Sequence, residues 1–75
     1  MNVHSPELLA QRRDIGARLR KFREEAKLTQ AQLAEKMQVD DTTVSKIEAG
    51  KWNFTIDFLN LFIENLELTL EINKK

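Results

Sequence analysis

The stretch LTQAQLAEKMQVDDTTVSKIEAGKWNFT, residues 28–55, decides the fold. Its apolar residues recur at helical spacing in two short blocks, which predicts one helix over residues 30–37 and another that begins near residue 41. Thr29 and Asp40 stand just before these helices and are residue types preferred as N-caps. Only a few residues separate the two helices, so the stretch has the layout of a helix-turn-helix.

The two helices of this stretch must pack through their apolar sides. The side chains expected to face inward are Leu33, Ala34, Met37, Val44 and Ile47. Ala34 is small, as a close helix crossing requires. The other side of the second helix is then held outward, and its short polar side chains suit a major groove about 12 Å wide. By itself, however, such a pattern is more typical of an ordinary solvent-exposed face.

Helices are predicted on both sides of this stretch. Ser5 as N-cap and Pro6 at the first helical position start a helix that runs to about residue 27. Its apolar stripe consists of Ile15, Leu19, Phe22 and Ala26. Thr55 caps a helix over residues 56–66, with a core stripe of Ile56, Leu59, Phe62, Ile63 and Leu66. Phe58 and Leu61 widen that stripe beyond the apolar surface that a small monomer needs.

The period of the sequence changes after residue 66. In ELTLEI, residues 67–72, apolar and polar residues alternate, which predicts a strand. A lone strand leaves its backbone unpaired, and no other convincing strand exists in the sequence, so the expected partner is the same strand of a second copy. We therefore predict a homodimer with an interface formed by Phe58, Leu61, Leu68, Leu70 and Ile72.

Together these elements predict an all-α fold. We expect a compact domain of four to five helices with a central helix-turn-helix, and a short C-terminal β-strand paired across a dimer. Residues 1–13 would form an N-terminal helical extension, residues 14–66 the helix-turn-helix domain, and residues 67–75 the strand and tail used for dimerisation. A chain of 75 residues is near the lower limit for a self-supporting core, which favours a partner.

Composition argues against several kinds of site. There is no cysteine and a single histidine, His4, so neither disulfides nor a metal site are expected. The sequence has no glycine-rich phosphate loop, and its acids do not converge, so we expect neither an enzyme nor a cofactor. No apolar run approaches the roughly 20 residues of a membrane span, and nothing resembles a signal peptide, which predicts a soluble, cytoplasmic protein with no membrane partner.

Charge is distributed unevenly along the chain, although 12 basic and 12 acidic residues give a formal net charge of zero. Residues 12–27 contain seven bases and three acids, whereas residues 54–73 contain four acids and no base. A basic segment is typical of a nucleic-acid-binding surface, but a solvated helix face produces similar runs.

The quoted stretch resembles the Cro/repressor-type (XRE-like) helix-turn-helix family of bacterial and phage DNA-binding regulators. The resemblance covers roughly residues 15–66. Its markers in register are Thr29 and Gln30 opening the second helix, Ala34 at the crossing, Val39 after the turn, Val44 and Ile47 on the buried side, and Glu48 with the sequence GKWN. The resemblance implies a sequence-specific regulator of transcription, with repression the expected effect, that binds double-stranded DNA as a homodimer through a recognition helix over residues 41–48.

The resemblance also implies roles for individual residues. Gln30 would fix the domain on a phosphate and brace the recognition helix, and Lys51 and Asn53 match the loop that grips phosphate. The residues facing base edges or the flanking backbone would be Asp41, Thr42, Thr43, Ser45 and Lys46. Family members often pair an arginine late in the first helix with the glutamate ending the third, which here would join Arg23 to Glu48. The other interpretation is an exposed pair worth less than about 1 kcal/mol.

Two adjacent aspartates open the recognition helix, although DNA is a polyanion. Asp40 is expected to act as N-cap by accepting the amide protons of Thr42 or Thr43. Asp41 has three possible roles: it stabilises the first turn, it accepts a hydrogen bond from the amine of cytosine, or it weakens indiscriminate phosphate binding. We favour the first and third, which together predict modest non-specific affinity.

Two other positions need separate interpretation. Gln38 occupies a turn position that is usually glycine in the family, where a left-handed conformation costs on the order of 1 kcal/mol for other residues. Trp52 either packs on the sugar-phosphate surface or shields the core beside Phe54.

A second function remains open for the same fold. Small members of the family serve as antitoxins that bind a toxin and repress their own operon. The strand over residues 67–72 and the apolar face around Phe58 and Leu61 would then meet a different protein. The sequence has no long disordered tail of the kind many antitoxins use, so we rank this function second. The operator sequence and any inducer are not predicted.

Overall fold

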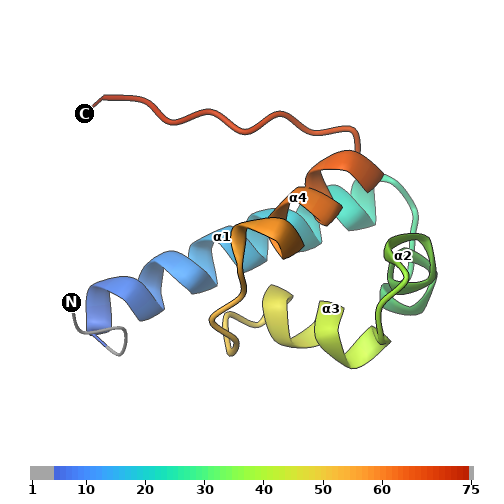
Figure 1. Ribbon diagram of the computed structural model, residues 1–75, viewed down its shortest axis with the longest axis horizontal. Helices are drawn as coiled ribbons and strands as arrows, with labels where there is room; N and C mark the ends of the chain where they lie inside the picture. Colours follow the sequence, from blue (N-terminus) through green and yellow to red (C-terminus); the bar gives the residue numbers. More distant parts are fainter. Residues whose placement is uncertain (1–4, 75) are drawn as a thin grey trace.

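The computed structural model describes residues 5–74. Within that range the chain forms four helices, α1 (Pro6–Glu25), α2 (Gln30–Met37), α3 (Asp41–Glu48) and α4 (Ile56–Asn65), and no strand. Helix α2 packs against α3, α3 against α1, and α4 against α2 (Figure 1). The predicted all-α fold with a central helix-turn-helix is confirmed, with four helices in the described part of the chain.

Helix starts follow the predicted capping residues in three of these helices. The hydroxyl of Thr29 accepts a hydrogen bond from the Gln32 amide at 3.0 Å, and the Gln32 side chain accepts one from the Thr29 amide at 2.9 Å. This reciprocal pair is a capping box, which satisfies two amides at the start of α2. Ser5 caps α1 and Thr55 caps α4 in the simpler way, each accepting one amide proton at 3.3 Å.

A left-handed residue ends each of α1 to α4, at the C-cap of α2 and just after the C-cap of the other three helices. These residues are Lys27, Gln38, Gly50 and Glu67, with φ between 55° and 71°. In every case the next amide donates to the carbonyl five residues earlier, over 2.8–3.2 Å, at pairs 28–23, 39–34, 51–46 and 68–63. This bond satisfies a carbonyl that the helix leaves unpaired. Gln38, with φ 59° and ψ 43°, confirms the predicted left-handed turn.

The hydrophobic core lies where the helices meet. Its buried members are Leu19, Leu33, Ala34, Met37, Val44, Ile47 and Phe62, which include every inward-facing residue predicted for α2 and α3. The stripe predicted for α1 is confirmed only at Leu19, because α1 buries Gly16 and Arg23 beside Leu19. Ile15 and Phe22 instead remain 36% and 41% exposed.

Gly16 explains how α1 approaches α3 so closely. A Cβ atom placed on Gly16 would lie 2.4 Å from the carbonyl oxygen of Ile47 and 2.5 Å from that of Glu48. Such distances are far inside van der Waals contact, so glycine is required where α1 crosses the last turn of α3.

Helix α4 also differs from the prediction. Ile56 was expected in the core but is 65% exposed, whereas Phe62 is fully buried. Phe58 and Leu61, which the sequence marked as surplus, are half-buried and pack against the core of their own chain. Part of the unusual apolar width of α4 is therefore used within one molecule.

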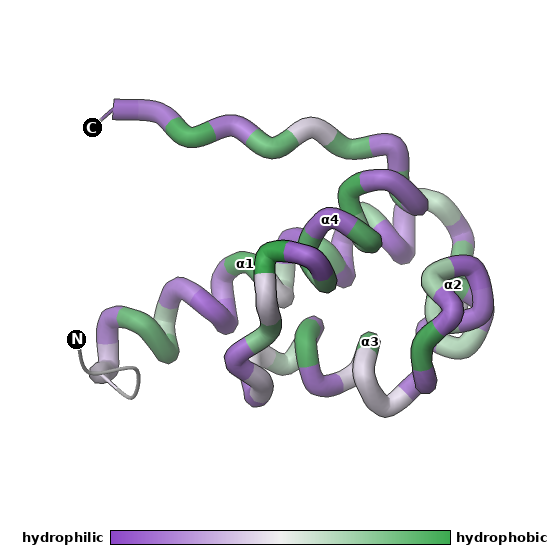
Figure 2. The backbone as a smooth tube through the Cα atoms, in the orientation of Figure 1, coloured by the Kyte–Doolittle hydropathy of each residue, from purple (hydrophilic) through white to green (hydrophobic). Residues whose placement is uncertain are grey.

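The strand predicted over residues 67–72 is not formed. Beyond α4 the tail runs back along the molecule, without regular secondary structure as far as residue 74 (Figure 1). A strand is defined by hydrogen bonds to a neighbouring strand, and residues 5–74 supply none. The alternation of apolar and polar residues is nevertheless evident along the tail (Figure 2).

Candidate nucleic-acid interface

The outward face of α3 is fixed by what its other face buries. Val44 and Ile47 are completely buried in the core, which sets the rotation of the helix. The opposite side carries the predicted contact residues: Asp41, Thr42, Ser45 and Lys46 are exposed and Thr43 is half-buried. The structure thus presents a short-chained polar face on one helix of two turns, as the sequence predicts. Whether these residues contact DNA remains a prediction.

One carboxylate joins α3 to both of the helices that precede it. The Glu48 Oε2 atom accepts a hydrogen bond from Arg23 Nε at 2.7 Å, and Oε1 accepts one from Arg23 Nη2 at 3.0 Å. Gln30 Nε2 donates to the same Oε1 at 3.0 Å, and Arg23 Nη1 donates to the Leu28 carbonyl at 2.7 Å. Arg23 and Glu48 are each only 7% exposed. The predicted pairing is therefore present, and its interpretation as an exposed pair is wrong.

The electrostatics of this cluster favour the ionised pair. The hydrogen bond to Glu48 raises the pKa of Arg23 above its ordinary value, an effect that outweighs the opposing influence of burial. The planar guanidinium engages both carboxylate oxygens, a geometry that lysine cannot reproduce. The amide nitrogen of Gln30 holds the Glu48 carboxylate at the end of α3, so the expected link between Gln30 and this helix is present. The predicted contact of Gln30 with a DNA phosphate remains a prediction.

The two aspartates at the start of α3 behave differently from the capping expectation. Asp40 stands at the N-cap position with extended φ and ψ of −72° and 149°, but its carboxylate makes no capping hydrogen bond with α3 in the described chain. The backbone carbonyl of Asp40 accepts the Thr43 amide proton instead, at 3.0 Å. The carboxylate cap predicted for Asp40 is therefore wrong. Asp41 lies exposed in the first turn of α3, where its negative charge interacts favourably with the positive end of the helix dipole.

The loop between α3 and α4 exposes two of the predicted phosphate contacts. Lys51 and Asn53 are exposed, whereas Trp52 between them is half-buried. The Trp52 ring meets Phe58 edge to face, with ring centroids 4.8 Å apart and planes at 67°. Trp52 therefore shields the core, although its partner is Phe58 rather than Phe54, and this packing anchors the loop.

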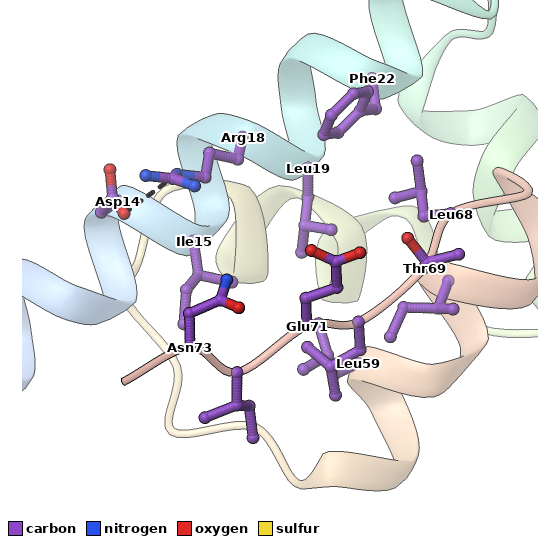
Figure 3. A pocket seen from close by; sticks show the side chains of 13 residues that line it. Asp14, Ile15, Arg18, Leu19, Phe22, Leu59, Leu68, Thr69, Glu71 and Asn73 are labelled. Carbon is purple, nitrogen blue, oxygen red and sulfur yellow. Dashed lines mark ion pairs between the residues drawn. The ribbon is translucent and has the colours of Figure 1, made fainter. Parts of the chain in front are cut away.

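A second surface feature is an open groove of about 670 Å³ between α1, α4 and the tail (Figure 3). The predicted interface residues Leu68, Leu70 and Ile72 line it, whereas Phe58 and Leu61 do not. Ile15 and Phe22 line the same groove and were missed as surface residues. Helical spacing puts both residues on the same stripe as Leu19, so the sequence carried no signal that they face the groove.

Other kinds of site are not supported by the described residues. Among residues 5–74, no group of three or more histidine, cysteine, aspartate or glutamate residues is arranged to hold a metal ion, and His4 lies outside that range. None of the helices described in residues 5–74 has the length and apolar character needed to cross a membrane.

Comparison with known proteins gives a consistent result. The family model described as a helix-turn-helix domain matches residues 14–71. The restriction-modification controller protein C.AhdI from Aeromonas hydrophila superposes with a TM-score of 0.77 and 26% identity, over 81% of this chain and 88% of that one. The clp gene regulator ClgR from C. glutamicum superposes with a TM-score of 0.75 and is 29% identical, over 79% of this chain and 76% of that one.

A second controller protein has higher identity. A point mutant of the restriction-modification controller C.Esp1396I is 35% identical, with a TM-score of 0.71, over 76% of this chain and 72% of that one. No curated protein matches the chain significantly.

Proposed function

This chain belongs to the helix-turn-helix domain family, a family of DNA-binding regulators rather than enzymes, and we propose that it represses transcription by binding a specific double-stranded DNA site as a homodimer. The observation that carries the proposal is the exposed polar face of α3, held in place by the buried Arg23–Glu48 pair. The similar solved proteins include a gene regulator and two restriction-modification controllers. We place the protein in the cytoplasm, where its DNA target lies.

Within this function we assign two kinds of DNA contact. The recognition residues on α3 enter the major groove and read base edges, and they are Asp41, Thr42, Thr43, Ser45 and Lys46. Gln30, Lys51 and Asn53 contact the phosphate backbone, where the positive ends of α2 and α4 add to the attraction. Residues 14–66 form the DNA-binding unit in this assignment, and the tail serves dimerisation.

Fluorescence anisotropy on labelled DNA from the region upstream of the gene, against unrelated DNA at about 150 mM salt, tests this assignment. Thr42→Ala and Lys46→Ala should reduce the preference for the specific site. Lys51→Ala should weaken binding to both DNAs alike and flatten the salt dependence. If all three variants kept full affinity and full preference, α3 would not be the reading element. A reporter gene under the same upstream region tests repression.

Substitution of Asp41 distinguishes two proposed roles of its carboxylate. If it limits indiscriminate phosphate binding, Asp41→Ala should tighten binding to unrelated DNA while the preferred sequence stays the same. If it accepts a hydrogen bond from cytosine, the same substitution should lose about 1–3 kcal/mol at one position of the site. Base-by-base substitution of the site distinguishes these results.

The homodimer would form through the tail and the groove beside it. Leu70 and Ile72 are 52% and 91% exposed, and Ile15 and Phe22 leave apolar surface in the groove. The tail also has backbone groups that a second tail can pair. Pairing would therefore create the predicted strand, which one chain alone cannot form.

The sequence of the tail selects one antiparallel register. With Leu70 opposite Leu70 of the second copy, Leu68 faces the other Ile72 and all apolar residues share one face. A shift by two residues in either direction places two glutamates opposite each other, Glu67 with Glu71 or Glu71 with itself, which is destabilising. A shift by one residue puts apolar residues opposite polar ones. The pair centred on Leu70 is therefore favoured.

Cross-linking tests both the dimer and its register, because the chain contains no cysteine. Leu70→Cys should form a disulfide between copies, since opposed residues in antiparallel strands have Cα atoms about 4.5–5.5 Å apart. Ile72→Cys is the matched control, because in this register the two copies of residue 72 are too far apart. Equal cross-linking of both variants would contradict the register, and a monomeric wild-type protein would contradict the dimer.

The same groove supports the second candidate, an antitoxin-like protein whose tail pairs with a different protein. Light scattering distinguishes the two before any partner is known. A monomer that gives no specific shift on its upstream DNA would favour the antitoxin-like function, whereas a dimer that gives one would favour the autonomous repressor.

A further inference from the structure

Helix α1 begins before the region that the family model matches. It starts at Pro6 and continues without interruption to Glu25, whereas the matched region starts at residue 14. In Figure 1 the N-terminal half of α1 extends past the loop that joins α3 to α4. Residues 6–13 therefore lie outside the part of the chain that the family model matches.

Arg13 is the residue of this extension that meets the loop. A Cβ atom placed on Gly50 would lie 2.7 Å from both the Cα and Cγ atoms of Arg13, and 2.8 Å from its backbone nitrogen. Gly50 itself is buried, whereas Arg13 remains exposed. The Cα and Cγ atoms of Arg13 thus lie against the loop, and the residue as a whole is exposed to solvent. Since neighbouring Cα atoms are 3.8 Å apart, the Cα of Lys51 is no more than about 8 Å from that of Arg13.

The charges around Arg13 favour an anion. Lys46, at the end of the exposed α3 face, and Lys51 are both exposed. Two acids beside this position pair with other residues: Asp14, next to Arg13 in the sequence, pairs with Arg18 at 3.1 Å, and Glu48, close to Gly50, pairs with Arg23 at 2.7 Å. An exposed arginine close to an exposed lysine suits a phosphate group, to which arginine can donate two hydrogen bonds.

We propose that Arg13 contacts a DNA phosphate beside the one gripped by Lys51, so that the N-terminal extension of α1 enlarges the DNA-binding surface beyond the helix-turn-helix. The inference rests on the proposed function, because it requires that α3 lies in a major groove. The strand backbone that flanks the C-terminal end of α3 then passes the Gly50 loop. Arg13 adds affinity there without reading sequence, since phosphate contacts carry no base information.

A purely structural role makes a different prediction. Arg13 also lies near the C-terminal end of α3, where a cation stabilises the negative end of the helix by about 0.3–1 kcal/mol. In that case its removal would lower the unfolding temperature and leave DNA binding by the folded protein unchanged. The salt dependence of binding separates the two roles, because only a phosphate contact releases counterions from DNA.

The test compares Arg13→Ala, Arg13→Lys and the control Arg18→Ala in the full chain. Arg18 is an exposed arginine on the same helix, on its groove side, and removing it subtracts the same charge. Anisotropy on the upstream site and on unrelated DNA, over a salt series, gives affinity and salt slope. Arg13→Ala should weaken binding to both DNAs by the same factor. It should also reduce the slope of log affinity against log salt concentration by about 0.9 for each phosphate that is no longer neutralised, or about 1.8 in a dimer. Arg13→Lys should keep most of the slope.

Two results would overturn the inference while leaving the proposed function intact. In the first, Arg13→Ala binds DNA with the affinity and salt slope of the wild type. In the second, Arg18→Ala loses as much affinity and slope as Arg13→Ala, which would indicate a general effect of charge. Wild-type protein that bound neither DNA would remove the proposed function and the Arg13 contact together.

Discussion

Replacing Glu48 by alanine should be among the most damaging single substitutions in this domain. The change removes both hydrogen bonds from the Arg23 guanidinium and the one from Gln30, and it leaves Arg23 buried with only the Leu28 carbonyl as acceptor. Breaking a buried ion pair from one side costs about 3–5 kcal/mol. A domain of 75 residues has a free energy of unfolding of roughly 4–11 kcal/mol, so the loss is a large part of the total.

Urea unfolding followed by circular dichroism measures this loss, and the melting temperature should fall by at least about 12 °C. Because Glu48→Ala is expected to be only marginally stable, two further variants are measured beside it. They are Glu48→Gln and the double variant Arg23→Met with Glu48→Leu. The glutamine variant should lose less, and the double variant should recover most of the stability, because it removes the buried charge altogether. A loss below about 1 kcal/mol in Glu48→Ala would refute the reasoning, since that is the value of an exposed pair.

The pH dependence of this pair follows from the raised pKa of Arg23. A group whose pKa is higher in the folded state contributes stability that is fully present below its unfolded pKa and is lost as the pH rises through the folded one. For arginine both values lie above the range of ordinary buffers. The difference in unfolding free energy between wild type and Arg23→Met should therefore stay constant between about pH 7 and pH 9, and a decline across that range would contradict it.

Four further predictions concern other contacts. Gly16→Ala should destabilise the domain by about 1–3 kcal/mol in urea unfolding, because the added methyl meets the Ile47 carbonyl at 2.4 Å, and an unchanged midpoint would contradict that close approach. Gln38→Gly should raise stability by about 0.5–1 kcal/mol by relieving a left-handed glutamine, so a lower melting temperature would argue against strain there. Thr29→Ala should cost about 1 kcal/mol through loss of the α2 capping box, measured in the same way. Leu70→Asp should yield monomers in light scattering, whereas Ile56→Asp, on exposed apolar surface outside the groove, should remain dimeric.

Local signals made the helix-turn-helix predictable. The hydroxyl of Thr29 acts on amides within its own first turn, and Gln38 terminates its helix through bonds no more than five residues long. The inward positions of α2 and α3 follow from helical spacing alone. For these reasons the helix starts, the turn conformation and the exposed polar face of α3 could all be anticipated.

Asp40 shows where local reasoning fails. Its residue type and its backbone angles suit an N-cap, but its carboxylate is not used as one. Capping preferences describe an average over many helices, and here the backbone carbonyl of Asp40 already accepts the Thr43 amide proton. The position of the helix start was right, and the hydrogen bond assigned to it was wrong.

The N-terminal helix shows a different limit. Its sequence offers two overlapping faces, one with Ile15 and Phe22 and one with Gly16 and Arg23, and the more hydrophobic face was expected inside. The structure buries the second, because Gly16 permits contact with the α3 carbonyls and Arg23 finds a carboxylate 25 positions away. Helical period cannot choose between faces when the deciding partner is distant in the chain.

The sequence by itself determined the helices, the side-chain caps of α1, α2 and α4, and the polar face of α3, because these depend on interactions within a few residues. Only the tertiary structure decided that Arg23, Glu48 and Gln30 form one buried cluster, that Ile15 and Phe22 line a groove with the tail, and that Arg13 lies against the loop at Gly50. Each of these depends on how helices cross. The strand predicted over residues 67–72 is not formed, because residues 5–74 of one chain provide no second strand to pair with its backbone.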